Sequence, residues 1–266
     1  MKIAQLIIRF HPAVGGAETH ALELSKALSK KHDVTILTSD LKSERPWKKL
    51  KNTPQKIGRV KIKRFKAVNQ IYPKLKGLKR HLQENNYDVI HCHAMPRNYV
   101  DTAARHGTGK LIITTHGLHF HDGPHPRITN LFGKLYFNTI GKRTLAKAHK
   151  VICISEQEKQ YLKKYTSEDK LVVIGNGIHY QKYQGRTRQG KKLLYIGRID
   201  KGKGLQHLIQ ALKGTSEELN IIGADHNYKK TLQKQIKKLG LTERVHFHGY
   251  VKEKEKIDYL KSCKAL

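Results

Sequence analysis

Short apolar runs alternate with amphipathic stretches along the first two thirds of the chain. The amphipathic stretches have helical spacing; in the first of them, Ala21, Leu24 and Leu28 share one face. This alternation is typical of a parallel sheet covered by helices. The predicted strands are Ile3–Ile8, Val34–Thr38, Val60–Phe65, Val89–His91, Leu111–Thr115, Val151–Ile154 and Leu171–Ile174. The predicted helices between them are Glu18–Lys31, Pro73–Glu84, Ile128–Lys147 and Glu156–Lys164.

The same pattern restarts after a polar, glycine-bearing stretch that has little to bury. We therefore predict an N-terminal domain over 1–180, a linker over 181–191 and a second domain over 192–266. Three strands and three helices make only half of a doubly wound sheet, so we expect the second domain to be incomplete. Its predicted elements are Lys192–Ile196, Gly204–Leu212, Leu219–Ile222, Lys229–Leu239, Val245–His248 and Glu253–Ser262.

Composition places the chain among globular proteins. Hydrophobic residues make up 38% of it, and no apolar run approaches the roughly 20 residues that span a bilayer. The N-terminal MKIAQLIIRF is interrupted by Gln5 and Arg9, so it predicts a strand and not a signal peptide. The three cysteines are widely separated and form no CxxC pair. We therefore expect a cytoplasmic protein without a disulfide framework.

The balance of charge is strongly basic, with 53 Lys and Arg against 21 Asp and Glu. Between Lys42 and Arg80 there are 15 basic residues and a single acidic one, Glu44. Such a field attracts nucleic acid or the acidic lipids of a membrane surface. A lysine-rich composition that decorates every exposed face explains the same excess. Aromatic residues are only 7%, and no recognition motif accompanies the charge, which disfavours nucleic acid.

Two loops have the composition of phosphate-binding turns. In HPAVGGAE, Gly15 and Gly16 precede a predicted helix, whose N-terminus favours an anion; a plain strand-to-helix turn explains them equally well. In LLYIGRIDKGKG, Arg198 and Lys203 follow a predicted strand, where they could meet the charge of a diphosphate leaving group. Neither a GxGxxG fingerprint nor a Walker A pattern occurs in these loops.

Histidines cluster after a third predicted strand, in THGLHFHDGPH. Placement at a strand end indicates that His116 lines a ligand crevice. A metal site is the alternative, but neither HExxH nor paired cysteines accompany these histidines, and no DxD triplet occurs in the chain. We therefore predict no metal. A sugar diphosphate would have to be held by cations and helix dipoles instead.

These segments, taken in order, resemble the family 4 retaining glycosyltransferases, which have the GT-B fold. The resemblance implies two Rossmann-like parallel-sheet domains that face a cleft, the first receiving the acceptor and the second the donor. It covers nearly the whole chain. The blocks that carry it are GGAE at 15–18, DVIHCH at 88–93, TTHG at 114–117, KAHKVICIS at 147–155, VIGNGI at 173–178, YIGRIDKGKG at 195–204, LNIIGAD at 219–225 and VHFHGYV at 245–251.

The resemblance also implies roles for individual residues. Gly15 and Gly16 would approach the donor diphosphate, and His116 would contact the donor sugar near the reacting centre. Arg198 and Lys203 would hold the diphosphate and stabilise it as it leaves. The positions in this chain where the family's backbone meets the nucleobase are Tyr250 and Val251.

The resemblance further implies the reaction and its partners. A sugar would move with retention, and without a metal or other cofactor, from a nucleotide sugar to a saccharide or lipid-linked acceptor. A UDP- or GDP-sugar is the favoured donor. The basic run from Lys42 to Arg80 lies in the acceptor domain, which favours a peripheral location on the anionic inner face of a membrane.

Two departures from the family pattern qualify these expectations. His179 stands where the family commonly has Asp, and the EGFG segment with its following glutamate is expected just beyond Leu266. We therefore expect a truncated chain, as a fragment or as half of a split enzyme, and whether it is active or inactive on its own is left open. The alternatives are a basic nucleic-acid-binding protein and a catalytically dead remnant that binds a nucleotide.

Overall fold

The chain forms two compact units in a computed structural model, Met1–Gly177 (unit 1) and Ile178–Leu266 (unit 2), each described here by itself. The structure describes residues 1–13, 15–44, 47–51, 53–69, 72–118, 127–178, 180–184 and 190–266, and gives only the backbone for 43, 44 and 127–130. His119, His121, His125 and His179 lie outside the described residues.

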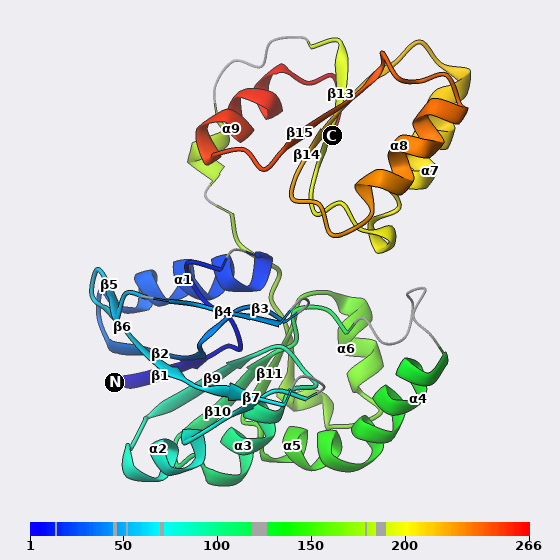
Figure 1. Ribbon diagram of the computed structural model, residues 1–266. Helices are drawn as coiled ribbons and strands as arrows, with labels where there is room; N and C mark the ends of the chain where they lie inside the picture. Colours follow the sequence, from blue (N-terminus) through cyan, green and yellow to red (C-terminus); the bar gives the residue numbers. More distant parts are fainter. Residues whose placement is uncertain are drawn as a thin grey trace. The chain divides into compact units, whose positions relative to one another are not determined.

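Unit 1 is built on an eight-stranded sheet with the order β12-β11-β10-β9-β1-β2-β6-β5 (Figure 1). All neighbouring strands are parallel except β5, which pairs antiparallel with β6. The order runs outward in both directions from β1, as in a doubly wound fold. The strands are β1 Lys2–Leu6, β2 Asp33–Ser39, β5 Lys56–Ile57, β6 Val60–Phe65, β9 Val89–His93, β10 Lys110–Thr114, β11 Lys150–Cys153 and β12 Leu171–Val173.

Helices cover both faces of this sheet, and each face has its own core. On one face, Ala21 of α1 (Gly16–Leu28) packs with alternate strand residues such as Ile3 and Ile36. On the other face, Leu82, Val100 and Leu162 pack against the remaining strand residues. They come from α2 (Leu78–Glu84), α3 (Asn98–His106) and α6 (Glu156–Leu162). Successive side chains of a strand point to opposite faces, so each central strand feeds both cores.

The predicted strands of unit 1 are confirmed within two residues at each end, but several connections were predicted wrongly or missed. The prediction of a helix over Pro73–Glu84 is wrong at its start, because Lys74–Leu75 forms β8 and the helix begins only after Gly77. Gly77 has φ 88°, a left-handed conformation that glycine adopts without strain. The segments that were missed include α3, β5, the hairpin of β3 (Leu41–Glu44) with β4 (Trp47–Lys49), and β7 (Ala67–Val68), which pairs with β8.

The long helix predicted over Ile128–Lys147 is present but is not uniform. It consists of α4 (Arg127–Tyr136), a π-helical turn over Phe137–Gly141, and α5 (Lys142–Lys147). The turn places Phe137 in the core, among the rings of Tyr136, Tyr161 and Tyr165. Apolar side chains on α4 stay exposed, including Leu131 at 65% and Phe132 at 66%.

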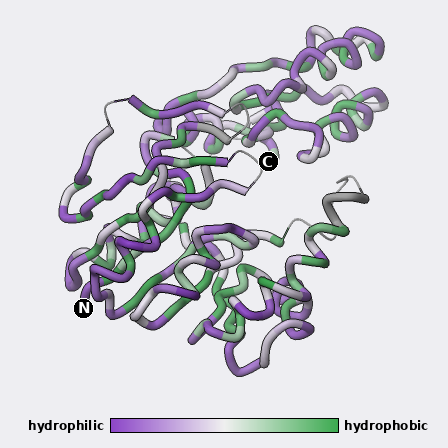
Figure 2. Tube along the Cα trace, turned by 60° about the horizontal axis from the view of Figure 1, so that its bottom comes forward, coloured by the Kyte–Doolittle hydropathy of each residue, from purple (hydrophilic) through white to green (hydrophobic). Residues whose placement is uncertain are grey.

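Unit 2 is a three-stranded parallel sheet with the order β13-β14-β15 (Figure 1). Side chains of α7 and α8, such as Ile209 and Ile236, pack against strand residues to form its core. On the open side of β13, Leu193 pairs with Ala265 in a parallel bridge. In Figure 2 the helices change repeatedly between hydrophobic and hydrophilic colours along their length, as expected for helices that cover a sheet on one side. The elements are β13 Lys192–Ile196, α7 Leu205–Ala211, β14 Glu218–Ile222, α8 Lys229–Lys238, β15 Val245–Gly249 and α9 Glu253–Ser262.

Candidate functional site

The strand order of unit 1 reverses at β1, between β2 on one side and β9 on the other. In open α/β sheets, ligands bind where the order reverses, beyond the carboxyl ends of the strands. The loops that follow β1, β9 and β10 meet at this edge. Gly15 and Gly16 lie at the start of α1, His93 ends β9 and His116 follows β10, so the predicted residues Gly15, Gly16 and His116 all lie at this edge, together with His93.

Gly15 and Gly16 begin α1, and their surroundings differ sharply. A Cβ atom on Gly15 would lie 2.3 Å from Oε2 of Glu18, whereas a Cβ on Gly16 would meet nothing within 4 Å. Glu18 is buried, and its carboxylate pairs with the Arg9 guanidinium at 2.8 Å. Gly15 therefore makes room for a buried ion pair, and Gly16 is the glycine with open space before it.

His116 lies directly after β10, where the backbone takes an unusual turn. Its φ of 52° is in the left-handed region, which few residues other than glycine adopt, and Gly117 follows at 95°. The ring of His116 is held by a hydrogen bond between its Nε2 and Nδ1 of His93, at 2.9 Å. His93 in turn bonds Oε1 of Gln5 through its Nε2, at 2.7 Å. Strained backbone that is fixed by its surroundings is common at functional sites.

The histidines of this edge are neutral at physiological pH. Burial lowers the pKa of His116 to about 4 and that of His91 to about 3, and the fully enclosed His93 has a pKa well below its usual range. The pKa of His20, on α1, is lowered by burial as well. Neutral imidazoles each carry one N–H and one acceptor nitrogen, so this edge offers hydrogen bonds without charge.

One nitrogen each of His20, His93 and His116 lies within 4.8 Å of the other two, a spacing that could hold a metal ion. Two of those nitrogens, however, already share the 2.9 Å hydrogen bond between His93 and His116. An ion bound to both rings would have to replace that proton. The arrangement in the structure is thus a hydrogen-bonded chain of imidazoles.

Glu158 of α6 holds the backbone on both sides of His116. Its buried carboxylate accepts hydrogen bonds from the hydroxyl of Thr115 and from the amide N–H of Leu118, the latter at 3.0 Å. The same carboxylate accepts the amide N–H of Ile154 at 2.8 Å, after the neighbouring strand. The backbone just before and just after His116 is therefore fixed.

In unit 2, the loops after all three strands are joined by backbone contacts. Gly197 donates to the carbonyl of Ile222, and Gly223 donates to that of Gly249. A Cβ on Gly223 would lie 1.7 Å from the carbonyl oxygen of Gly197, so these two loops touch backbone to backbone. Any larger residue than glycine at position 223 would separate them.

Arg198 and Lys203 both lie in the loop after β13. The Arg198 side chain is 60% exposed and makes one long ion pair, 3.4 Å, with Asp200. Lys203 is exposed and has no ion pair with a described carboxylate. Both cations are exposed to solvent and accessible to an anionic ligand, which would share Arg198 with Asp200.

Tyr250 and Val251 follow β15 at the same edge of the three-stranded sheet. The Tyr250 ring is 70% exposed and Val251 is half-buried. The structure therefore places both predicted groups of unit 2, the cations and the aromatic-apolar pair, beyond the carboxyl ends of its strands.

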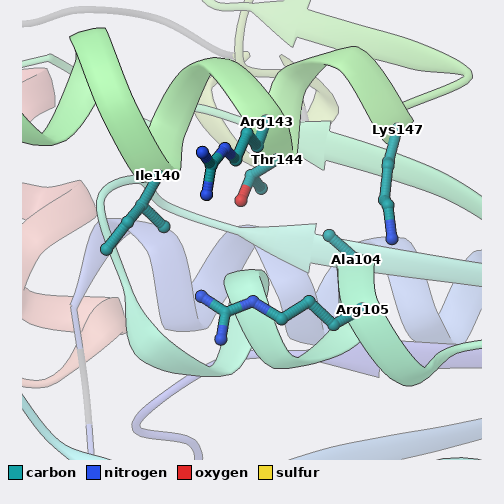
Figure 3. A pocket seen from close by; sticks show the side chains of 6 residues that line it. All are labelled: Ala104, Arg105, Ile140, Arg143, Thr144 and Lys147. Atoms are coloured by element: carbon teal, nitrogen blue, oxygen red, sulfur yellow. The ribbon is translucent and has the colours of Figure 1, made fainter.

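A groove on the surface of unit 1 lies between α3 and the π-turn with α5 (Figure 3). It has a volume of about 360 Å³ and is lined by three cations, Arg105, Arg143 and Lys147, together with Ile140. Ile140 is 38% exposed, and the exposed apolar residues of α4 precede it along the same helix. This face combines positive charge with exposed apolar surface.

Sequence reasoning missed Gln5, His20 and Glu158 as parts of the site. For Gln5 a signal exists: along β1 and β9 the polar Gln5, His91 and His93 occupy the positions that would face α1, where the pattern otherwise requires apolar residues. His20 and Glu158 are single polar residues on helices, and nothing local distinguishes them from solvent-exposed positions.

Comparison with known proteins gives the family. The model described as Glycosyltransferase Family 4 matches residues 14–182, and the model described as Glycosyl transferases group 1 matches residues 179–266. The chain therefore belongs to glycosyltransferase family 4, as its motifs predicted.

Similar curated proteins include two α-mannosyltransferases. The GDP-mannose:cellobiosyl-diphosphopolyprenol alpha-mannosyltransferase of Xanthomonas oryzae is 26% identical over 265 residues, which cover 92% of this chain and 66% of that protein. The protein of the same name from Xanthomonas campestris is 28% identical, with the same two coverages. The chain thus spans 66% of the length of these two relatives.

Solved structures confirm the predicted GT-B type of α/β fold. Sucrose-phosphate synthase from Thermosynechococcus elongatus aligns with a TM-score of 0.73 at 18% identity, over 98% of this chain and 73% of that one. Anabaena HepE in complex with UDP and glucose aligns with a TM-score of 0.71, also at 18% identity, over 99% and 72%. In the part of the chain that the structure describes, no helix has the length and apolar character to cross a membrane.

Proposed function

We propose that the chain is a glycosyltransferase that moves a sugar from a nucleotide-diphosphate sugar to a saccharide or lipid-linked acceptor, with retention and without a metal ion. The observation that carries the proposal is the family match of both units, combined with accessible cations beyond the strands of unit 2. A UDP- or GDP-sugar is the favoured donor; the similar proteins include a GDP-mannose-dependent enzyme and a structure that holds UDP.

Arg198 and Lys203 are proposed to hold the donor diphosphate and to stabilise the charge that develops as it leaves. A guanidinium pairs with two phosphate oxygens at once, and an ammonium adds a compact positive charge. Both groups lie in one loop, so they can meet the same diphosphate and offset the charge that develops on it. Tyr250 and Val251 are proposed to contact the nucleobase from the same edge.

In unit 1, Gly16 and His116 are proposed to meet the donor from the acceptor-side domain. Gly16 leaves open space at the start of α1, whose N-terminus favours a phosphate oxygen. Gly15 allows this turn by making room for Glu18. His116 is neutral and held in place, which suits a hydrogen bond to a sugar hydroxyl near the reacting carbon.

A lipid-linked acceptor is supported by the surface of unit 1. The described basic side chains between Lys42 and Arg80 are exposed, except for the half-buried Arg64, and along β6 they alternate with buried apolar ones. The groove beside α3 and the apolar side chains of α4 add a second basic and apolar face. Each such cation contributes about 1 kcal/mol toward an acidic lipid surface. The proposed location is therefore peripheral, on an anionic cytoplasmic membrane face.

Thermal unfolding with UDP-, GDP- and ADP-sugars tests the donor site. A ligand at 100 times its dissociation constant adds about 2.7 kcal/mol, which raises the melting temperature by several degrees in a protein of this size. Arg198→Ala and Lys203→Ala are expected to abolish that shift. The matched control is Lys234→Ala on α8, an exposed lysine whose loss changes the net charge equally. A full shift in Arg198→Ala would overturn the phosphate assignment.

Three further measurements test the finer parts of the proposal. The anomeric configuration of the product, read by NMR, shows retention or inversion. Transfer rates after treatment with a chelator test independence from metal, and a rate restored only by added Mg²⁺ or Mn²⁺ would contradict it. Flotation with anionic and neutral vesicles tests the membrane face. Equal binding to both vesicle types would count against an anionic surface, and binding to nucleic acid with a steep salt dependence would favour the alternative.

A further inference from the structure

Gln5 is a polar side chain enclosed in the centre of unit 1. It lies on β1, its side chain is fully buried, and its neighbours along the strand belong to the apolar cores. Burying an amide costs free energy unless its groups are hydrogen-bonded. Among the described residues its Nε2 has no partner, so the amide is retained in spite of one unmet group. The Gln5 side chain does make one hydrogen bond, between its Oε1 and Nε2 of His93.

The bond to Gln5 determines where the proton of His93 lies. His93 is neutral and therefore carries one N–H. The amide oxygen of Gln5 accepts but cannot donate, so the His93 proton is on Nε2, which lies 2.7 Å from that oxygen. Its Nδ1 is then an acceptor, and this nitrogen faces Nε2 of His116 at 2.9 Å.

The same reasoning extends one ring further. Because Nδ1 of His93 accepts, the neutral His116 must donate from Nε2 and carry its lone pair on Nδ1. The backbone on either side of His116 is held separately by Glu158. The position of the ring and the position of its proton are thus set by two different groups.

We propose that Gln5 and His93 are positioning residues that fix the tautomer of His116, so that His116 meets the donor sugar as a hydrogen-bond acceptor through Nδ1. The inference rests on the proposed function for the identity of the ligand, but not for the tautomer. A sugar hydroxyl that bonds to Nδ1 must then donate its proton. A hydroxyl can donate or accept, so the tautomer of His116 sets the direction of this hydrogen bond and leaves the lone pairs of the hydroxyl to other groups.

The direct test is the imidazole nitrogen chemical shifts of His116, measured by NMR on the ¹⁵N-labelled chain without ligand. In the natural chain we expect Nδ1 to be unprotonated and Nε2 to be protonated. In Gln5→Met, which keeps the length of the side chain but removes the acceptor, we expect a mixture of both tautomers. Transfer should fall through kcat, by about 10- to 100-fold, the range seen when a group that orients a ligating histidine is removed.

Thr114→Val is the matched control. The Thr114 hydroxyl lies 2.7 Å from Nε2 of His91, a buried hydrogen bond on the neighbouring strands that is not part of the chain to His116. We expect a comparable loss of thermal stability in this variant and no change in the His116 tautomer. A tautomer change in both variants would mean that the effect is structural and would overturn the proposal.

The natural chain alone can also overturn the proposal, so the test does not depend on the variant folding. A proton on Nδ1 of His116 would mean that the amide of Gln5 is turned and that the chain runs in the opposite direction. Failure of the proposed function is distinguishable, because it would appear as absent binding of nucleotide sugars while the tautomer remained as expected.

Discussion

The polar side chains at the carboxyl edges of the two sheets differ in burial, in charge and in hydrogen bonding. In unit 1 the polar groups are buried, neutral and bonded to one another, as in the chain from Gln5 through His93 to His116. In unit 2 they are exposed, charged and almost free of partners, as for Arg198 and Lys203. Both edges follow parallel strands in a Rossmann-like arrangement, so the fold alone does not account for the difference.

The difference follows from the costs of burial. A neutral imidazole can be buried if its nitrogens are bonded, and the bonds then fix its geometry. A buried cation would need a buried counter-charge, which would compete with a phosphate for the same guanidinium. Unit 1 is therefore suited to hold hydrogen-bonding groups in exact positions, and unit 2 to supply charge. We expect perturbations to affect the two units in different ways.

The largest difference between the two units is expected in how their stability depends on pH. Above about pH 6.5 the buried histidines are neutral in both the folded and the unfolded chain, so their titration leaves stability unchanged. Between pH 6.5 and about 4, the unfolded chain binds protons that His91, His93 and His116 do not bind when folded. The free energy of unfolding of unit 1 therefore falls as the pH falls, by up to about 1.4 kcal/mol per pH unit for each histidine.

The charges near these rings strengthen this expectation. The neighbours that lower the histidine pKa values are other histidines, including His20 of α1, and no carboxylate raises those values. The single tryptophan offers a probe of this effect. Trp47 lies in unit 1 and packs against its core, so its fluorescence reports the unfolding of that unit by urea. In unit 2 the pKa of His248 is lowered too, but its ring is exposed, so a smaller effect is expected there. Hydrogen exchange at about pH 7.5 and pH 5 measures both units; equal loss of protection would contradict the comparison.

The next largest effect is expected from Gly223→Ala in unit 2. This glycine has φ 149°, and an added Cβ would lie 1.7 Å from the backbone oxygen of Gly197. The backbone must move or strain, at a cost on the order of 3 kcal/mol. Gly214→Ala is the control, because a Cβ there meets nothing within 4 Å. Thermal unfolding and hydrogen exchange should show a weakened unit 2 with Trp47 fluorescence unchanged. Similar stability for the two variants would show that the loops do not touch.

The structure also shows why the strands of the two parallel sheets could be predicted from the sequence, whereas some helices and short hairpins could not. Runs such as Val60–Phe65 are apolar at buried positions and bounded by polar residues, so local pattern is sufficient. The helix α3 is short, and one of its four buried residues is the polar Asp101. That carboxylate accepts hydrogen bonds from three hydroxyls far along the chain, those of Tyr72, Tyr136 and Thr144. The sequence around α3 therefore does not predict that Asp101 is buried or which hydroxyl groups donate to it.

Some residues of the candidate site could likewise be predicted from the sequence, and others could not. The sequence placed His116, Arg198 and Lys203 at the carboxyl ends of strands, and the structure has them there; their roles remain predictions. Gln5 could have been found from its position in the strand pattern. Glu158 could not, because the loop that it holds beside His116 lies 40 residues earlier in the sequence.

The smallest effects are expected at the two glycines that begin α1, and here the sign should differ between neighbours. Gly16→Ala is expected to stabilise unit 1 by about 0.5 kcal/mol, because a Cβ meets nothing and alanine lowers the entropy of the unfolded chain. Gly15→Ala is expected to destabilise it by about 1 kcal/mol, because the Cβ would lie 2.3 Å from a carboxylate oxygen of Glu18. Urea unfolding followed through Trp47 measures both changes.

A double-mutant cycle isolates the cause. If the cost at Gly15 comes from Glu18, the same substitution in a Glu18→Ala background should cost nothing further, because the buried carboxylate is gone. Donor binding then distinguishes the two positions. Gly16→Ala should reduce the rise in melting temperature that a nucleotide sugar causes, although it stabilises the fold. The reason is that a methyl group would occupy the space proposed for a phosphate oxygen. A Gly16→Ala chain that is stabilised and binds donor as well as the natural one would show that this turn is a plain strand-to-helix connection.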